Sequence, residues 1–402
     1  MKILLLTDWT YPCDHQFLSN VYAQNFVDRG HEITWVMRPD NSEQKKIISE
    51  IWNGSNVYIL PPSAYDPARN TTRFLAGRIQ SNTLFEISVE FSEFDLVHVR
   101  NDLSMGLVAI HLANEFEIPY VHQITHLKSE EIIGAARSGS ENRISWVKGQ
   151  LGKRLRRYIA SSSDLVLPIS DAMKDHLENQ GYSTPMQTLP TGAEVINEAP
   201  NGDSFRNKYD VNREFVLLYM GSMSPYRELE FLFDMLQPVI KKYDTELVMA
   251  GGRSESNRER LKGEAKRRNV SDNVTFTGWI SNRSEIQSAV AAADIGLSPF
   301  RTDSILRTNA PIKTLEYMSL GTPVVASATP DQRKVIDESG AGVTVEHNTE
   351  PFSDAIDMLL SSQETRNKMG KKGREYLREN RNFDTLTNKT ESIYEDVVKH
   401  RV

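Results

Sequence analysis

Short apolar runs alternate with amphipathic stretches along almost the whole chain. Each run is long enough for one strand, and the stretches between the runs carry the apolar spacing of helices. Apolar strands separated by helices indicate an α/β fold with parallel sheets covered on both faces. In the first half the predicted strands begin at Lys2, Glu32, Asn56, Asp95, Pro119 and Asp164. In the second half they begin at Phe215, Glu246, Val274, Asp294, Pro323 and Gly342.

The alternation is interrupted once, by the polar stretch 191–213, which is rich in Gly, Asn and Asp and is predicted to be a linker. It separates two doubly wound domains, 1–190 and 214–382. The last helix lies in 383–402 and is expected to cross back to the first domain. Ligands of open parallel sheets bind beyond the carboxyl ends of the strands. Two such domains facing a central cleft would therefore place one ligand on each side.

Composition narrows the class of protein. The 402 residues are 39% hydrophobic and 25% charged, as in ordinary globular proteins, and the net charge of -7 gives no support for nucleic-acid binding. A single cysteine, Cys13, excludes an internal disulfide framework and favours a reducing compartment. The first apolar run stops at Asp8, too short for an export signal, and no run approaches a membrane span. We expect a cytoplasmic protein, attached at most to the membrane surface.

A cation stands at the start of one predicted helix, in the stretch "NAPIKTLEYMSLGTPVVAS" at 309–327. Asn309 or Ala310 would cap this helix, and Lys313 would lie in its first turn. A lysine there opposes the helix dipole by roughly 0.3–1 kcal/mol, whereas a bound anion would reverse the sign. The alternative is a surface pair between Lys313 and Glu316, worth roughly 0.2–0.5 kcal/mol.

A second cation occupies a similar place in "GSMSPYRELEFLFDML", residues 221–236. Gly221 ends a strand, a short loop follows, and Arg227 begins an amphipathic helix. Arg227 alone is compatible with an ordinary solvated residue. Two cations at two helix starts of one α/β domain fit a diphosphate group better than either cation does alone.

Taken with these two stretches, the chain resembles the retaining glycosyltransferases of family four, which have the GT-B fold of two Rossmann-like domains. The resemblance spans nearly the whole chain, and the order and spacing of the motifs make it specific. The matching pieces are "DRGHEITWV", "LVLPIS", "LPTGAE", "YMGSMSPYRELEFL", "LVMAGG", "VTFTGWI", "AADIGLSPF", "PIKTLEYMSLGTPVVAS" and "IYEDVV".

The resemblance implies a nucleotide-sugar site in the second domain. Glu316 resembles the glutamate that accepts hydrogen bonds from the donor ribose, because a carboxylate suits a vicinal diol. Arg227 stands where the family has a lysine on the diphosphate. Gly221 resembles the glycine that lets the loop approach the donor, and Trp279 lies where the base is usually held.

In the first domain, His126 follows the fifth predicted strand and matches a family histidine near the reacting sugar. His122 lies in the same apolar stretch. For either histidine, the alternative is an inert residue packed in the core. The loop after the first strand carries Asp14 and His15, which we expect on the acceptor side. Cys13 in the same loop is interpreted as a small buried filler.

Two positions of the second domain depart from the family pattern. Ser222 replaces the usual arginine after the second-domain glycine, which removes one phosphate contact. Thr308 replaces the first of two glutamates spaced eight positions apart. We keep Ser222, Thr308 and the adjacent Asn309 among the expected nucleotide-sugar contacts. Lys313 or Arg307 are the candidates for replacement charge.

Chemistry follows from these residue types. The sequence has no Asp-x-Asp pair and no clustered ligand set, so we expect no metal and no cofactor besides the donor substrate. Arg227, Lys313 and helix N-termini would then stabilise the departing diphosphate. The resemblance implies retention by attack on the leaving-group face, with a phosphate oxygen deprotonating the acceptor. The expected catalytic residues are His126, Arg227 and Lys313.

The stretch 143–159 is a predicted helix with many basic residues. One interpretation is a helix that lies on an anionic membrane and presents lipid-linked acceptors. The other is a core-packed helix with a solvated face. Its predicted apolar face consists of Ile144, Val147, Leu151, Leu155 and Tyr158.

These features favour an enzyme that transfers a sugar from a nucleotide diphosphate to a glycan, lipid-linked or small-molecule acceptor. A nucleotide-sugar epimerase of the same fold and a non-catalytic nucleotide-sugar-binding protein remain as alternatives. Nucleotide, sugar, acceptor and linkage stay open, because they depend on loop shape.

Overall fold

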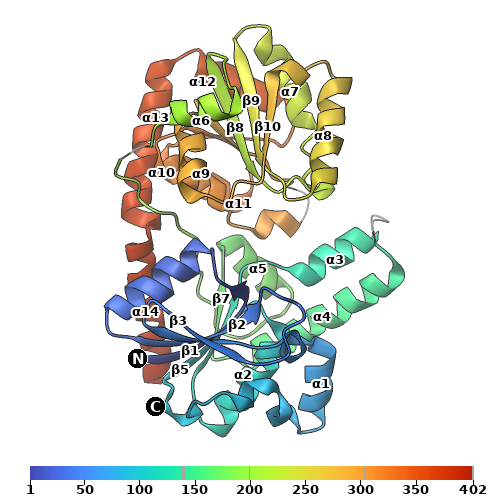
Figure 1. Ribbon diagram of the computed structural model, residues 1–402, viewed down its shortest axis with the longest axis vertical. Helices are drawn as coiled ribbons and strands as arrows, with labels where there is room; N and C mark the ends of the chain where they lie inside the picture. Colours follow the sequence, from blue (N-terminus) through green and yellow to red (C-terminus); the bar gives the residue numbers. More distant parts are fainter. Residues whose placement is uncertain (138–140, 199, 303–304, 401–402) are drawn as a thin grey trace. The chain divides into compact units, whose positions relative to one another are not determined.

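The computed structural model describes residues 1–137, 141–198, 200–302 and 305–400. It consists of two compact units (Figure 1). Unit 1 comprises Met1–Pro190 together with the C-terminal segment from Phe383, and unit 2 comprises Thr191–Asn382. Each unit is an α/β domain with its own sheet and its own hydrophobic clusters.

Unit 1 contains a seven-stranded sheet in the order β3-β4-β2-β1-β5-β6-β7. The strands are β1 (Lys2–Tyr11), β2 (Glu32–Pro39), β3 (Ile48–Trp52), β4 (Ser55–Ile59), β5 (Leu96–Arg100), β6 (Tyr120–Ile124) and β7 (Leu165–Pro168). All neighbours are parallel except β3, which pairs antiparallel with β4 and was not predicted. Asn53 and Gly54 join the two strands with φ of 49° and 82°, as a two-residue hairpin turn requires.

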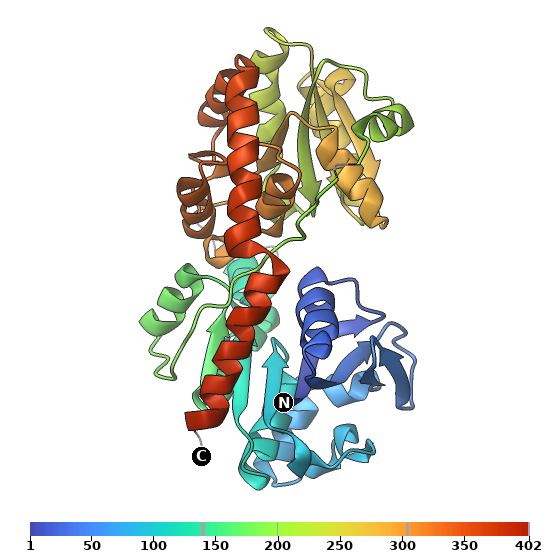
Figure 2. The same cartoon turned by 90° about the vertical axis from the view of Figure 1, so that its left-hand side faces the viewer.

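Helices cover both faces of this sheet. They are a π-helical segment (Leu18–Phe26), α1 (Pro67–Leu75), α2 (Leu103–Glu115), α3 (Lys128–Arg137), α4 (Arg143–Ser161), α5 (Asp171–Asn179) and α14 (Phe383–His400). α2 is buried along most of its length in one hydrophobic cluster. On the other face, Leu386 and Tyr394 of α14 join the cluster formed by Leu5 and Val121, and Figure 2 shows α14 running along this side of the unit.

Unit 2 contains a six-stranded, fully parallel sheet in the order β10-β9-β8-β11-β12-β13. The strands are β8 (Phe215–Gly221), β9 (Thr245–Gly251), β10 (Val274–Gly278), β11 (Ile295–Ser298), β12 (Val324–Ser327) and β13 (Gly342–Val345). The helices are α6 (Gly202–Tyr209), α7 (Phe231–Ile240), α8 (Glu255–Arg267), α9 (Arg283–Ala291), α10 (Ile312–Ser319), α11 (Pro330–Ser339), α12 (Thr349–Leu360) and α13 (Gln363–Tyr376).

The expected linker 191–213 is part of unit 2 and contains α6, which differs from the expectation of an irregular segment. Asn201 caps this helix, and Phe205 is buried. Gly202 lies against the backbone of Ala292, where a Cβ atom would come within 2.8 Å. The helix presents too few apolar residues to show a period, and packing against α9 holds it in place.

Both sheets reverse their strand order once along the sheet. The reversal lies between β1 and β5 in unit 1, and between β8 and β11 in unit 2. At such a switch point the loops diverge beyond the carboxyl ends of the strands and leave a crevice for ligands. The residues that follow these four strands are therefore the first place to look for a site.

Candidate functional site

Lys313 stands in the first turn of α10 in unit 2. The residue that caps this helix is Pro311, not Asn309 or Ala310, and Pro311 provides no side-chain hydrogen bond. Proline has no polar side-chain group, so the first backbone N–H groups of the helix lack a side-chain acceptor. α10 thus begins with the donors that an anion would bind.

The ammonium group of Lys313 lies over two aromatic rings. Its Nζ is 4.3 Å from the ring centroid of Tyr219 and 4.9 Å from that of Phe300. Burial, together with the positive charge of Arg227, holds the pKa of Lys313 well below its usual value. Within the described part of the chain, Lys313 makes no hydrogen bond or ion pair through its ammonium group.

Arg227 contacts the same aromatic ring. Its guanidinium carbon lies 4.6 Å from the centroid of Phe300, and its Nε and Nη1 atoms are buried without a hydrogen-bond partner among the described residues. The acids that follow it are already paired, because Glu228 binds Arg301 and Glu230 binds Arg260. Two cations therefore share one phenylalanine ring, and neither makes an ion pair with an acid of the described chain. The charge of Glu316 acts on Lys313 only at longer range.

Arg227 does not stand at the start of a helix, as the sequence predicted. It ends a short 3-10 turn, Pro225–Arg227, whereas α7 begins only at Phe231. The turn closes with Glu228 in the left-handed region, at φ 50°. Arg227 is therefore a loop residue and lies outside the field of the first turn of α7.

Gly221 ends β8 with φ of 135°, a backbone conformation that favours glycine. A Cβ atom at this position would come within 3.2 Å of Lys313 Nζ. The missing side chain leaves the ammonium group room beside the strand end. Ser222 is exposed, and its hydroxyl is 2.7 Å from that of Ser224.

Hydrogen bonds anchor α10 to the sheet. The Tyr317 hydroxyl donates to the carbonyls of Leu218 on β8 and Leu297 on β11, at 3.0 and 3.2 Å. It also accepts from the backbone N–H of Met220 at 3.1 Å. The helix that carries Lys313 is thereby tied to both strands at the switch point. Charges held this rigidly need little reorganisation when a charged group binds.

Glu316, one helical turn beyond Lys313, is held by another helix. Arg283 of α9 donates through Nη1 to Glu316 Oε1 at 2.7 Å. The Arg283 Nε atom is 3.9 Å from a carboxylate oxygen of Glu194. This pair fixes one oxygen of Glu316 and leaves the carboxylate partly exposed.

The other residues expected to contact the donor do not join this group of cations. Trp279 is 50% exposed, and the guanidinium carbon of Arg253 lies 4.0 Å from its ring centroid. Thr308 is buried, and its hydroxyl donates to the carbonyl of Ile305 at 2.8 Å. Asn309 is half-buried, and Arg307 is exposed. The geometry brings Arg227, Lys313 and Gly221 together but does not by itself give Thr308 or Asn309 a role.

In unit 1, His126 follows β6 and is half-buried, with Nδ1 3.5 Å from the Thr125 hydroxyl. Burial lowers its pKa, against the opposing effect of Asp8. His122 lies inside the strand, fully buried, with Nδ1 2.9 Å from the Tyr120 hydroxyl. These surroundings match a packed core histidine at His122 and a strand-end histidine at His126.

The two expected acceptor-side residues lie next to each other in the loop after β1 but have different surroundings. Asp14 is exposed. His15 packs edge-on against Trp9, with ring centroids 4.6 Å apart, and its Nε2 accepts from Arg100 Nη2 at 3.3 Å. Burial and the charge of Arg100 lower the pKa of His15 to about 3, so it is neutral. Cys13 packs against the core, and burial raises its pKa to about 11.

Two polar residues at this edge were not predicted from the sequence. Arg100 ends β5 with only 4% of its surface exposed, and its Nη1 atom lies 4.0 Å from Asp8 on β1. The available signal was a charged residue at the carboxyl end of an otherwise apolar run, in "LLLTD" and in "LVHVR".

The helix predicted over 143–159 corresponds to α4. Leu155 packs against the hydrophobic core, as the core-packed interpretation requires. Ile144, Val147, Leu151 and Tyr158 are 65%, 48%, 57% and 46% exposed, and we call these residues the α4 face.

Among the described residues, no helix has both the length and the apolar character that crossing a bilayer demands. The described residues also contain no group of three or more His, Cys, Asp or Glu side chains placed to hold a metal ion.

Two α/β units with parallel sheets, and two cations beside the switch point of the unit 2 sheet, one on a helix and one in a loop, are features shared with nucleotide-sugar-dependent glycosyltransferases of the GT-B fold. Two family models match the chain: Glycosyltransferase Family 4 over residues 22–195, and Glycosyl transferases group 1 over residues 202–376. The chain belongs to this family and is a retaining glycosyltransferase.

Relatives and solved structures agree with this assignment. Alpha-monoglucosyldiacylglycerol synthase of Streptococcus pneumoniae is 27% identical over 352 residues, covering 85% of this chain and 74% of that protein. Sucrose-phosphate synthase of Thermosynechococcus elongatus has the same fold, with a TM-score of 0.77 at 17% identity and complete coverage of both chains. Anabaena HepE in complex with UDP-glucose matches with a TM-score of 0.70 at 15% identity, over 98% of this chain and 100% of that one.

Proposed function

We propose that this glycosyltransferase moves a sugar from a nucleoside diphosphate to an acceptor without a metal ion, and that Arg227 and Lys313 stabilise the departing diphosphate. The observation that carries the proposal is the pair of cations on Phe300, neither of which has an acidic partner in the described chain. Both residues are partly buried. Positive charge that is partly withdrawn from water without an ion-pair partner is costly in a free protein and becomes favourable when a dianion binds.

The bond changes assign each group a part. The bond between the sugar's anomeric carbon and the diphosphate oxygen breaks, while a bond from an acceptor hydroxyl to that carbon forms on the same face. The hydroxyl proton passes to the departing phosphate oxygen. Arg227, Lys313 and the open N-terminus of α10 bind the negative charge that develops on the diphosphate. Glu316 accepts from the ribose hydroxyls, and His126 contacts the reacting sugar.

UDP-glucose is the first donor to test, because HepE, which shares the fold, forms a complex with it. Trp279 is half-exposed and already stacked with Arg253, which suits a planar base beside it. A thermal-shift panel of UDP-, GDP- and ADP-sugars then identifies the nucleotide and sugar that stabilise the protein most.

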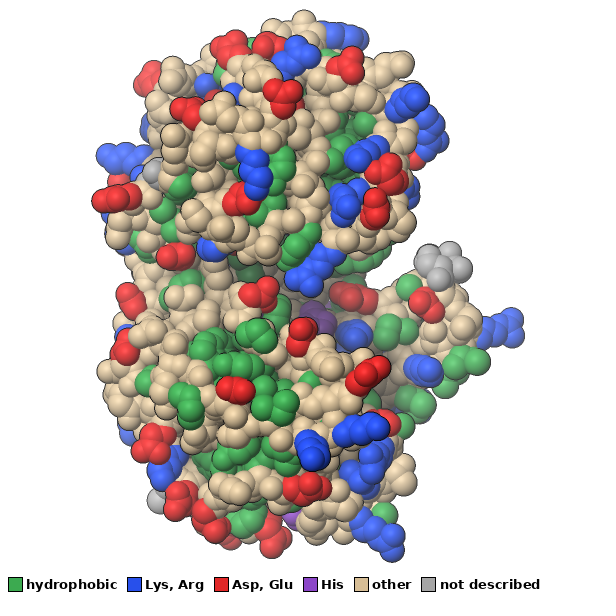
Figure 3. All heavy atoms as spheres, in the orientation of Figure 1, with side chains coloured by type: hydrophobic (Ala, Val, Ile, Leu, Met, Phe, Trp, Pro, Cys, Tyr) green, Lys and Arg blue, Asp and Glu red, His purple; other side chains and the backbone are tan. Residues whose placement is uncertain are grey.

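For the acceptor, we propose a lipid-linked molecule at a membrane surface. The Streptococcus pneumoniae relative is named for the glucolipid that it makes. The α4 face is exposed, and Leu75 at the end of the neighbouring α1 is 80% exposed. Basic and hydrophobic side chains lie side by side on the projecting α3–α4 part of unit 1 in Figure 3. An exposed apolar stripe bordered by cations binds anionic bilayers.

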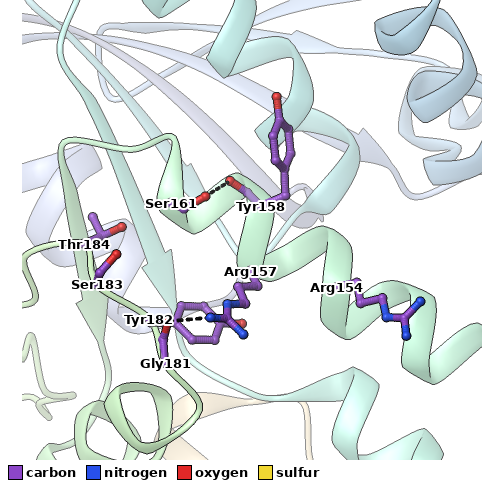
Figure 4. Close-up of a pocket in the computed structure, with 8 residues that line it drawn as sticks. All are labelled: Arg154, Arg157, Tyr158, Ser161, Gly181, Tyr182, Ser183 and Thr184. Carbon is purple, nitrogen blue, oxygen red and sulfur yellow. Dashed lines mark hydrogen bonds between the residues drawn. The ribbon is translucent and has the colours of Figure 1, made fainter.

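A pocket beside the α4 face also supports the proposal that this part of unit 1 faces a membrane (Figure 4). It encloses about 370 Å³ between the second half of α4 and the loop at 181–184. Its described lining contains Arg154 and Arg157 and no carboxylate. Arg157 donates to the carbonyl of Gly181 at 2.8 Å, whereas Arg154 has no hydrogen-bond or ion-pair partner within the described residues. A basic hollow next to an apolar stripe suits the phosphate region of a bilayer.

One assay separates the candidate functions. The protein is incubated with labelled UDP-glucose and with phosphatidylcholine vesicles that contain or lack diacylglycerol. Uridine diphosphate released only with diacylglycerol, with label in the lipid, indicates transfer. A changed sugar without release indicates an epimerase, and binding without either reaction indicates a binding protein. If no sugar nucleotide of the panel binds or turns over, the proposal is wrong.

Membrane docking has its own test. Flotation with phosphatidylglycerol vesicles should retain the native protein. The double variant I144E/L151E should bind at least about 10-fold more weakly, because it loses two exposed apolar side chains that would enter the bilayer. Ile51→Glu is the matched control, since Ile51 is 62% exposed on β3 and is not part of the α4 face. Equal binding of all three proteins would contradict the role of α4.

A further inference from the structure

Polar atoms without partners gather at the switch point of the unit 1 sheet. They belong to the end of β1, the loop after it and the end of β5. Asp8 Oδ1, His15 Nδ1 and both Nε and Nη1 of Arg100 are buried and make no hydrogen bond with any residue that the structure describes. Most buried polar groups of native proteins are hydrogen-bonded, so a group of exceptions at a strand edge calls for a missing partner.

Arg100 is the most constrained member of this group. It is 4% exposed, yet within the described parts of the chain only its Nη2 atom has a close partner, His15 Nε2 at 3.3 Å. Its Nη1 atom is 4.0 Å from Asp8 Oδ1, too far for a direct hydrogen bond. A folding role alone would favour a closed contact or an apolar residue here, because a buried unsatisfied charge destabilises a protein.

A bulge in β1 creates this spacing. The pairing of β1 with β2 shifts register between Leu6 and Thr10, so the strand bends where Asp8 leaves it. Bulges commonly re-aim a side chain next to a site. Asp8 is thereby turned toward Arg100 while its side chain keeps 25% exposure.

The charges around the gap cancel. Asp8 faces Arg100, and Arg38 at the end of β2 pairs with the buried carboxylate of Asp102. His15 is neutral at physiological pH. Each cation of this edge is thus matched by a carboxylate, and an incoming phosphate would meet Asp8. The arrangement suits a neutral group that both donates and accepts hydrogen bonds.

We propose that Asp8 and Arg100 form the acceptor subsite and that it takes a hydroxyl of a neutral polyol, such as a sugar or glycerol unit. This inference rests on the proposed transfer function. A hydroxyl that enters between them donates to Asp8 Oδ1 and accepts from Arg100 Nη1, which satisfies both unpaired atoms. Both atoms are covered by protein in the structure, so neighbouring side chains have to move aside for it. Asp8 is the contacting residue that is partly exposed, and Arg100 also positions it and His15.

The first experiment compares Asp8→Asn, Arg100→Met and Arg100→Lys with the native protein. Arg100→Met should melt at the same or a higher temperature, because methionine fills the site without an unpaired charge. Its affinity for UDP-glucose by calorimetry should be unchanged, while transfer falls about 100-fold or more through misplacement of the acceptor. Arg100→Lys should recover part of the transfer. A lower melting temperature with transfer lost only in proportion to folded protein would make Arg100 a structural residue and overturn the proposal.

The second experiment reads the subsite directly, without turnover. Saturation-transfer NMR is recorded with glycerol and glucose as neutral probes, and with glycerol 3-phosphate as the anionic probe. Signals from the neutral probes that disappear in Asp8→Asn support the inference. Preference for the phosphate, or neutral signals unchanged in Asp8→Asn, overturn it. UDP-glucose binding is measured separately, so a failure of the proposed transfer function is distinguished from a failure of this subsite.

Discussion

The switch points of the two units carry opposite electrostatic designs on similar scaffolds. In unit 2, Arg227 and Lys313 share the ring of Phe300 and have no acidic partner within the described chain. In unit 1, Arg100 faces Asp8, and Arg38 is paired with Asp102. Both places follow the carboxyl ends of parallel strands, so the sheet sets the location and the side chains set the chemistry.

The difference indicates what each place is prepared to bind. Uncompensated cations on aromatic faces match a diphosphate, whose charge grows as the sugar departs. Matched charges with unpaired hydrogen-bonding atoms fit the proposed hydroxyl ligand, which needs orientation more than charge. The predictions below test this contrast from the largest expected effect to the smallest.

Removing either cation of unit 2 should have the largest effect on activity. We expect Lys313→Met and Arg227→Met each to lower kcat/KM by about 100- to 1,000-fold, because each removes charge stabilisation of the transition state. The double variant should lose less than the product of the single losses, since both groups act on one diphosphate. Steady-state kinetics with the best donor of the panel measures this.

Lys371→Met is the control for that series, because Lys371 is 79% exposed on α13. Its activity should equal that of the native protein. Activity retained in Lys313→Met would show that the buried lysine is not part of the reaction.

Glu316→Ala should weaken donor binding by about 1–3 kcal/mol, since it removes the proposed acceptor of the ribose hydroxyls and the ion-pair partner of Arg283. Calorimetric titration of the donor gives the value. Arg283→Gln separates the two contributions, because it keeps the glutamate while removing the ion pair. Unchanged donor affinity in Glu316→Ala would count against the ribose role.

Stability should respond in opposite directions in the two units. Arg38→Met should lower the free energy of unfolding by about 1–2 kcal/mol, because it strands the buried Asp102; the loss is moderated because Arg38 is 39% exposed. Lys313→Met should raise the free energy of unfolding at pH 7, because it removes a partly buried ammonium group that has no ion-pair partner in the described chain. Urea unfolding of both variants measures the two changes. A lower free energy of unfolding in both variants would contradict the proposed difference between the two units.

The smallest expected effect is an uptake of protons when the donor binds. The pKa of Lys313 is lowered by burial and by Arg227 in the free protein, and a bound diphosphate raises it again. Donor binding should therefore take up a fraction of a proton, and affinity should fall as the pH rises through the lowered pKa. Calorimetry in buffers of different ionisation enthalpy detects the uptake. Lys313→Met should abolish it, and uptake that persists in this variant would assign the proton elsewhere.

Much of the framework is readable from the sequence, because apolar runs such as "KILLL" and "FVLLYMG" mark central strands directly. The turn at Asn53 and Gly54 carried the signal for β3, although the exposed strand itself has no apolar pattern. α6 could not be predicted from its few apolar residues, because contact with α9 stabilises it.

The candidate site was less readable. Lys313 was recognisable because its helix could be located, and a cation in a first turn is unusual. The gathering of Arg227 and Lys313 on Phe300 depends on a 3-10 turn and on residues far apart in sequence. Arg100 and Asp8 were missed because burial of a charged strand end becomes evident only when neighbouring strands are in register.

The position of α14 in the chain has a consequence for biosynthesis. Phe383, Leu386 and Tyr394 complete a hydrophobic cluster of unit 1, yet they follow the whole of unit 2 in the sequence. A ribosome therefore releases unit 2 in full before the first-made unit can cover its own sheet. The nascent chain carries a bare apolar face during that interval, which makes it a natural client for chaperones. The unit that is made first is the last to mature.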